Sequence, residues 1–89
     1  MGEVSTIAEL SGRKRVTLEV EDSISIGFGI VLTPGLYLGW SGRYWLGAQH
    51  FVELTTEEVT TLGGKPPASA EFLLYDVSSF VRSGKIRVF

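Results

Sequence analysis

The most constraining feature of this sequence is a stretch of twenty residues, from Ser23 to Gly42, that contains no charged side chain. A window of this length could cross a membrane as a helix. However, glycine recurs throughout the stretch, and both glycine and the Pro34-Gly35 pair disfavour a continuous helix. Apolar side chains alternate with small ones from Ile24 to Ile30, which is the two-residue period of a strand. We therefore predict β-structure here and no membrane span.

Turn signals divide this region into successive strands. Thr33-Pro34-Gly35-Leu36 carries proline and glycine where a type II turn needs them. Ser41-Gly42 is a second turn signal, and Arg43–Glu53 is rich enough in β-branched and aromatic residues for a longer strand with a bulge at Gly47. We predict a three-stranded antiparallel meander from Ile24 to Val52.

The flanking segments carry shorter signals. Val16, Leu18 and Val20 alternate with polar residues, which predicts a half-buried strand ending before Glu21-Asp22-Ser23. Further along, Thr55 and Glu58 have the spacing of a capping box, with Leu54 and Val59 at the positions of a hydrophobic staple. A short helix should therefore begin after Thr55 and end at Gly63, followed by a loop over residues 63–69.

Two interpretations of residues 71–83 stay open. Apolar residues recur at helical spacing, so one helix could run from Pro67 to Gly84. Alternatively, Phe72–Tyr75 is a buried strand, Asp76 or Ser78 is an N-cap, and Phe80–Ser83 forms one helical turn. We favour strand, helical turn and strand, with Lys85–Phe89 as the final strand.

Together these segments predict a mainly β fold with one or two short helices. We expect a small antiparallel meander curled into a partly open barrel of the SH3-like or OB-like kind. The 89 residues are too few for two ordinary domains, so residues 1–89 should form a single domain with residues 1–12 as a flexible N-terminus.

The composition argues against several functional classes. The chain has no cysteine and one histidine, His50, so disulfides, thiolate nucleophiles and multi-histidine metal sites are excluded. Glu57 and Glu58 diverge around a helix, and Glu19 and Glu21 fit a solvated strand face. No glycine pattern matches a phosphate-binding loop. We expect neither an enzyme nor a cofactor, and no signal peptide is recognisable, which makes a cytoplasmic location the default.

The meander also predicts a binding surface. In simple register Gly29 lies opposite Trp40, Val31 opposite Leu38, and Leu38 opposite Trp45. One face then carries the expected core, namely Ile24, Ile26, Phe28, Ile30, Leu32, Tyr37, Tyr44 and Leu46. The opposite face is also apolar and must be covered by the C-terminal segment or by another molecule, although a bulge would exchange the two faces. The predicted partner-binding residues are Gly27, Gly29, Leu38, Trp40, Arg43 and Trp45.

These features favour a small non-catalytic protein-binding module. It would either self-assemble as a homo-oligomer or act as an inhibitor or adaptor of a larger protein, and a virus-encoded protein is one plausible setting. The alternative is a nucleic-acid-binding barrel that stacks bases on its aromatic residues. Its phosphate contacts would be Arg13, Lys14, Arg15, Arg43, Lys85 and Arg87. The net charge of −2 disfavours this alternative.

Overall fold

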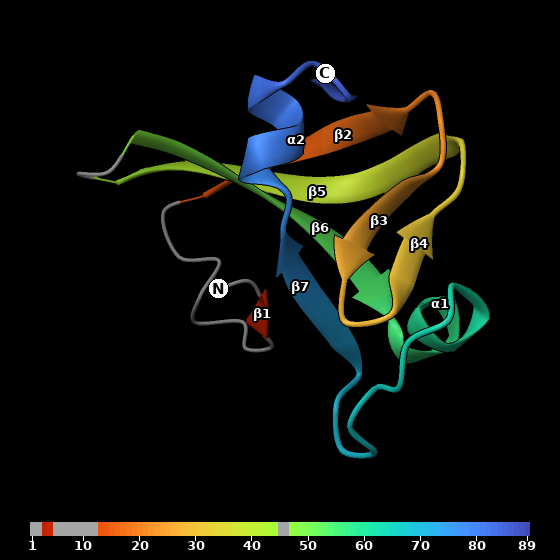
Figure 1. The fold of residues 1–89 in the computed structure, drawn as a ribbon. Helices are drawn as coiled ribbons and strands as arrows, with labels where there is room; N and C mark the ends of the chain where they lie inside the picture. Colours follow the sequence, from red (N-terminus) through yellow and green to blue (C-terminus); the bar gives the residue numbers. More distant parts are fainter. Residues whose placement is uncertain (1–2, 5–12, 45–46) are drawn as a thin grey trace.

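A computed structural model describes residues 3–4, 13–44 and 47–89 (Figure 1). The strands and helices in chain order are β1 (Glu3–Val4), β2 (Lys14–Val20), β3 (Ile24–Gly27), β4 (Ile30–Leu32), β5 (Gly35–Tyr44), β6 (Gly47–Thr55), α1 (Thr56–Thr61), β7 (Phe72–Asp76), α2 (Ser78–Arg82) and β8 (Ile86–Val88). Apart from β1, the predicted flexible N-terminus lies outside the described residues.

The strands form one six-stranded sheet and one separate hairpin. The sheet order is β1-β7-β6-β5-β2-β8, with every neighbouring pair antiparallel, and β3 pairs only with β4. This confirms the predicted mainly β class with antiparallel strands and two short helices. Over the described residues the sheet stays open and does not close into a barrel.

The hydrophobic core lies between one face of this sheet and the β3–β4 hairpin (Figure 1). Alternate residues of four sheet strands point to this inner face, because strand side chains alternate. They contribute Leu18, Val20, Val52, Leu54, Leu73, Tyr75 and Ile86, all buried. From the other side come Ile24, Ile30 and Leu32 of the hairpin, Val59 of α1 and Val77.

The prediction of one strand from Ile24 to Leu32 is wrong. Gly27, Phe28 and Gly29 all have positive φ, of 99°, 57° and 75°. Three successive residues in this region reverse the chain and make a tight hairpin, in which Ile24 pairs with Leu32. Hence β4 pairs with β3 and not with β5, and the predicted meander does not form.

Phe28 is also wrongly assigned to the core. Its position in the turn leaves 58% of its surface exposed, and its ring contacts Tyr75 at 5.5 Å between centroids. Ile26 and Tyr37 do pack against the core. The side chains of Tyr44 and Leu46 lie outside the description.

Ser41-Gly42 is not a turn. Strand β5 continues through both residues to Tyr44, and its register with β6 is constant from Gly39↔Val52 to Tyr44↔Gly47. This register also contradicts the predicted bulge at Gly47. A Cβ on Gly42 would lie 2.7 Å from Arg13 Cγ, so the glycine leaves room for the side chain of the residue that precedes β2.

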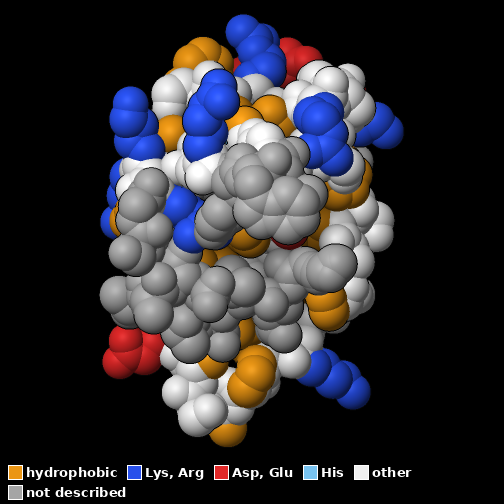
Figure 2. Space-filling view, turned by 90° about the vertical axis from the view of Figure 1, so that its left-hand side faces the viewer, with side chains coloured by type: hydrophobic (Ala, Val, Ile, Leu, Met, Phe, Trp, Pro, Cys, Tyr) orange, Lys and Arg blue, Asp and Glu red, His pale blue; other side chains and the backbone are white. Residues whose placement is uncertain are grey.

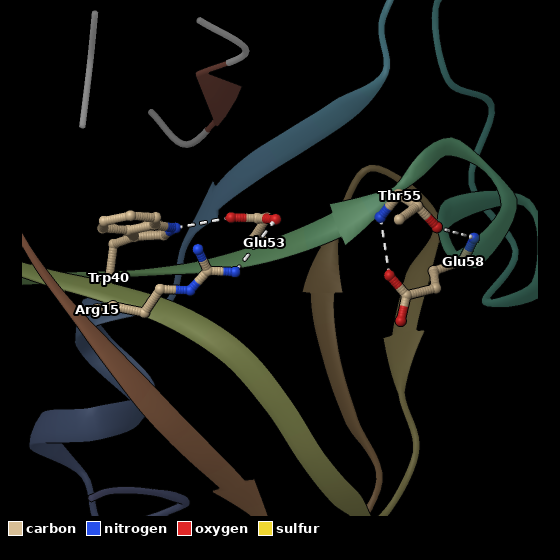
Figure 3. A network of polar contacts seen from close by, with 5 residues as sticks. All are labelled: Arg15, Trp40, Glu53, Thr55 and Glu58. Carbon is tan, nitrogen blue, oxygen red and sulfur yellow. Dashed lines mark hydrogen bonds and ion pairs between the residues drawn. The ribbon is translucent and has the colours of Figure 1, made fainter. Parts of the chain in front are cut away.

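Two other predictions based on local signals are confirmed. β2 lies where Val16–Val20 predicted it, and α1 has a complete capping box. The Thr55 hydroxyl accepts from the Glu58 amide at 3.1 Å, and the Glu58 carboxylate accepts from the Thr55 amide at 2.8 Å (Figure 3).

The C-terminal part is the favoured order of strand, short helix and strand. The N-cap residue of α2 is Val77, not Asp76 or Ser78. The Asp76 carboxylate nevertheless accepts from the Ser78 amide at 2.8 Å, so it still holds the first residue of this helix.

Candidate interaction surface

The sheet has an outer face opposite the core, and strand register determines which residues lie on it. Directly paired residues of antiparallel strands share a face. Arg15 pairs with Trp40, which pairs with Phe51, and Thr17 pairs with Leu38. These pairs alternate with the buried core pairs, so they lie on the outer face.

The last residue in the sequence joins this face. Phe89 exchanges two backbone hydrogen bonds with Thr17, of 3.1 and 2.8 Å, and such a mutual pair is directly opposed. The ring of Phe89 therefore lies on the same side as Thr17 and Leu38.

Exposed apolar side chains gather on the outer face. Leu36, Leu38 and Phe89 are 69%, 49% and 65% exposed, and the partly buried Trp40 lies two residues from Leu38 along β5. The other strongly exposed large hydrophobic residues in the described part of the chain, Phe28 and Val31, belong to the hairpin. We call Leu36, Leu38, Trp40 and Phe89 the outer apolar patch. Exposed patches of this kind are typical of interaction sites.

Charged side chains hold one edge of this patch in place. The indole Nε1 of Trp40 donates to Glu53 Oε1 at 2.7 Å, and the Arg15 guanidinium lies 4.9 Å from the Trp40 ring centroid and 3.9 Å from the Glu53 carboxylate (Figure 3). Tryptophan and arginine are the residue types that most often dominate binding energy at interfaces.

A similar arrangement supports Phe89. The Arg87 guanidinium lies 5.6 Å from the Phe89 ring centroid. It also lies 3.6 Å from Glu19 and 3.7 Å from Glu21. The patch thus has an apolar centre with charged residues of both signs beside it, which is the usual layout of a protein-binding surface.

The structure brings together only two of the six predicted partner-binding residues. Leu38 and Trp40 share the outer face. Arg43 lies on the opposite face, because it is three residues from Trp40 on a strand without a bulge. Gly27 and Gly29 form the hairpin turn on the core side, so Gly29 does not lie opposite Trp40. Trp45 lies outside the described residues.

The C-terminal segment does not cover the patch, contrary to one of the two predicted possibilities. Helix α2 directs Phe80 and Val81 against the core on the inner face, and β8 extends the edge of the sheet beside β2. Sequence reasoning missed Phe89 as a site residue. The alternation of Ile86 and Val88 with Arg87 and Phe89 is the signal that could have found it.

A second feature is an open groove of about 990 Å³ between the hairpin, β6 and α2. Its polar lining residues are Ser25, Gln49, Asp76, Ser78, Ser79 and Arg82, and its aromatic ones are Phe28 and Phe80. The groove falls in the size range of small-molecule sites.

His50 lies close to this groove. Its Nδ1 is 2.6 Å from the Ser41 hydroxyl, and its amide donates to Ser78 Oγ at 3.0 Å. Burial lowers the pKa of His50 below its ordinary value, Asp76 raises the pKa and Arg82 lowers it. A nucleophilic triad needs a carboxylate hydrogen-bonded to the imidazole, and among the described residues the ring bonds only to Ser41. The geometry shown therefore lacks the triad arrangement.

Within the described ranges, no cluster of three potential metal ligands occurs and no helix is long and apolar enough to cross a membrane. Comparison of the chain with protein-family models, curated proteins and solved structures gave no match.

Proposed function

We propose that this chain is a small non-catalytic protein-binding module that uses the outer face of its sheet. The observation that carries this proposal is the outer apolar patch, in which two leucines and a phenylalanine are about half exposed or more beside an arginine-stacked tryptophan. Leaving these groups in water contributes nothing to folding, whereas burying them against a partner is favourable by roughly 25 cal/mol per Å². The partner is either a second copy of the chain or a larger protein that the module inhibits or links.

The test compares a disrupted patch with a control variant at an exposed position outside the patch. Leu36→Asp combined with Leu38→Asp places two charges in the patch, whereas Val31→Asp places one on an exposed position of the hairpin. We expect the double variant to lose a protein that both the wild type and Val31→Asp retain in affinity capture. With that protein purified, the dissociation constant should rise by about thirtyfold or more, since hot-spot losses are about 2 kcal/mol each.

Native mass over a wide concentration range separates the two kinds of partner. If the wild type forms a dimer or larger assembly that the double variant disperses, the partner is a second copy. If all three proteins behave alike in both measurements, the outer patch is not a binding surface and the proposal is wrong.

Nucleic-acid binding is the second candidate, and the distribution of charge favours it. Figure 2 views the side toward which the β5–β6 hairpin and the start of β2 point, and Lys and Arg side chains gather across its upper part. Against it, Trp40 and Phe51 already stack with Arg15 and Arg13, and Phe51 is buried, so neither ring is free for a base. Titration with single-stranded and duplex oligonucleotides at low salt tests whether the protein binds nucleic acid, because phosphate-driven binding is strongest at low salt.

A further inference from the structure

Two adjoining grooves lie between β3 and α2. The larger is the open groove of about 990 Å³ described above. The smaller, of about 390 Å³, is lined by residues 21–25, Phe80 and residues 83–85. Ser25 of β3 and Phe80 of α2 line both grooves, so the grooves adjoin at these two residues. Residues 21–28 and 78–85, which form the two walls, all belong to the described part of the chain.

A hydrogen bond of the neighbouring strand shows which way the Ser25 backbone points. Ser25 lies directly opposite Val31 of β4. The Val31 amide donates to the Leu62 carbonyl oxygen at 3.0 Å, so Val31 directs its amide away from β3. Directly opposed residues of an antiparallel pair either bond each other or both point outward. The amide and the carbonyl of Ser25 therefore point away from β4.

The side of β3 that faces away from β4 is the side of the grooves. Helix α2 lies across β3 from β4 (Figure 1), and Ser25 lines both grooves between β3 and α2. Within the described ranges, β3 pairs with no strand except β4, and no other backbone group bonds the Ser25 amide or carbonyl on the α2 side. An unpaired donor and acceptor at a strand edge form a template for another strand.

We infer that the space between β3 and α2 binds an extended peptide segment of another protein, which pairs antiparallel with β3 through Ser25. The site is separate from the outer apolar patch and gives the chain a second binding surface. Strand addition to a sheet edge is a recurring mode of peptide recognition, in which main-chain hydrogen bonds supply affinity and alternate side chains supply specificity.

Strand alternation identifies the side chains that the segment carries. The residue opposite Ser25 shares its side of the ladder, and Ser25 is exposed, so a polar residue fits there. The residues before and after it point to the other side, as Ile24 and Ile26 do, and both isoleucines pack in the core. There they would meet Phe80, which packs against the core but is only partly buried. The segment therefore carries an apolar residue on each side of a polar one.

The unequal grooves set the order of the two apolar residues. A large side chain fits the larger groove, where Phe28 is 58% exposed, and a smaller one fits the smaller groove. β3 runs from Ile24, which lines the smaller groove, to Gly27, which lines the larger one. In an antiparallel segment the large residue therefore precedes the polar one. Charged residues of both signs line the grooves, so charge does not select the segment.

The experiment uses two capped peptides of identical composition. One carries phenylalanine, threonine and valine in this order between terminal glycines, and the other carries the same three residues in reverse order. NMR titration of the 89-residue protein follows the Ser25 amide signal. We expect the first peptide to bind at least tenfold more tightly, with the Ser25 amide shifting downfield as it gains a hydrogen bond. Equal affinities, or no binding of the first peptide at millimolar concentration, overturn the inference.

Two variants of Ser25 test the main-chain pairing. Ser25→Ala removes the hydroxyl and keeps the amide, and should bind the first peptide as the wild type does. Ser25→Pro removes both, and should abolish binding. The fold should tolerate the proline because the amide that it removes points away from β4. If both variants bind the peptide equally well, the peptide forms no strand on β3 and the inference is wrong.

N-methylation of the first peptide repeats this test without changing the protein. A methyl group on the threonine nitrogen blocks the hydrogen bond to the Ser25 carbonyl, whereas one on the valine nitrogen lies on the opposite edge of the added strand. The threonine-methylated peptide should bind at least tenfold more weakly than the valine-methylated one. Equal affinity of the two overturns the inference.

The leucine double variant separates this site from the proposed function. Leu36 and Leu38 are not among the described residues that line the two grooves, so Leu36→Asp with Leu38→Asp should bind the first peptide as the wild type does. Loss of peptide binding in this variant would place the peptide on the outer apolar patch and overturn the inference. Failure of the peptide to bind the wild type would leave the result of the outer-patch test unchanged.

Discussion

The indole Nε1 of Trp40 donates a 2.7 Å hydrogen bond to the carboxylate of Glu53, which lies two residues along β6 from Phe51, the direct cross-strand partner of Trp40. This diagonal contact fixes the indole against the sheet, and Arg15 stacks on its ring. Trp40 is therefore positioned by contacts within its own chain, and under the proposed function this would lower the entropy cost of binding a partner.

Replacing Trp40 by phenylalanine should destabilise the fold. The variant leaves the mostly buried carboxylate of Glu53 without its donor, and hydrogen bonds to charged groups contribute about 1.5–3 kcal/mol. Urea denaturation should show a loss of about 2 kcal/mol. Glu53→Gln keeps an acceptor for the indole and should cost less. Equal losses in the two variants would show that the hydrogen bond is not the cause.

Substitutions of the two leucines Leu38 and Leu54 should differ strongly in how much folding stability they cost. Leu38 is half exposed, so Leu38→Thr, which places a β-branched residue on the strand, should change stability by no more than about 0.5 kcal/mol. Leu54 is fully buried, and Leu54→Ala should cost about 2–5 kcal/mol. Urea midpoints of both variants provide the measurement. A large loss for Leu38→Thr would mean that the patch is covered within the chain.

Several local signals in this sequence predicted local structure correctly. The capping box of Thr55 and Glu58 needs only four residues, and it placed α1 correctly. The alternation in β2 and in the last strand, as well as the strand and helical turn before it, was also visible within short windows. Each of these signals depends on neighbours in the chain and not on which strand pairs with which.

Strand pairing was not predictable, because the same alternation fits different topologies. A period of two from Ile24 to Leu32 is satisfied by one long strand. It is also satisfied by a hairpin that turns at Phe28 and keeps Ile30 and Leu32 buried. The glycines beside Phe28 permit the turn but do not require it.

The turn predicted at Ser41-Gly42 also determined which residues were predicted to share a binding site. A Ser-Gly pair favours a turn from sequence, but in the structure the absence of a side chain at Gly42 leaves room for Arg13, the residue that precedes β2. Because β5 continues without a turn to Tyr44, Arg43 and Trp40 lie on opposite faces of the sheet. A single turn assignment thus decided which residues could share a site.

Gly39 lies where three strands approach closely, and Gly39→Ala should be strongly destabilising. An added Cβ would lie 2.6 Å from the Leu18 side chain and 2.9 Å from the carbonyl oxygen of Phe51. Overpacking of this kind costs about 1–3 kcal/mol. Gly42→Ala on the same strand is the control, because the atoms nearest to its new Cβ all belong to the flexible side chain of Arg13. Thermal unfolding should show the larger drop in Tm for Gly39→Ala.

Removing either half of the capping box should cost about 1 kcal/mol. Thr55→Ala leaves the Glu58 amide without its acceptor, and Glu58→Ala does the same for the Thr55 amide. Glu57→Ala is the control, since Glu57 also lies in the first turn of α1 but takes no part in the box. The expected losses are measured by chemical denaturation of these three variants and of the double variant that combines Thr55→Ala with Glu58→Ala. The loss of stability in the double variant should be smaller than the sum of the losses in the two single variants if the two hydrogen bonds support each other.

His50 should make stability depend on pH. Burial, with Arg82, holds the pKa of His50 below its ordinary value of 6.5, and Asp76 opposes this shift. The unfolded chain therefore binds the proton more readily than the folded chain. By linkage, stability is fully present above about pH 6.5 and falls as the pH drops toward the lowered folded pKa.

Two substitutions around His50 should change this pH dependence of stability in opposite directions. Asp76→Asn removes the charge that raises the pKa of His50, so the pKa should fall further and the loss of stability on acidification should grow. Arg82→Gln removes a charge that lowers the pKa, so the loss should shrink. His50→Gln should abolish the dependence between about pH 7 and pH 5.5, since no other side-chain type ordinarily titrates in this range. NMR titration of the His50 ring measures its pKa, and urea denaturation at each pH measures the free energy of unfolding. If Asp76→Asn and Arg82→Gln shift the pKa of His50 in the same direction, the electrostatic account of this histidine is wrong.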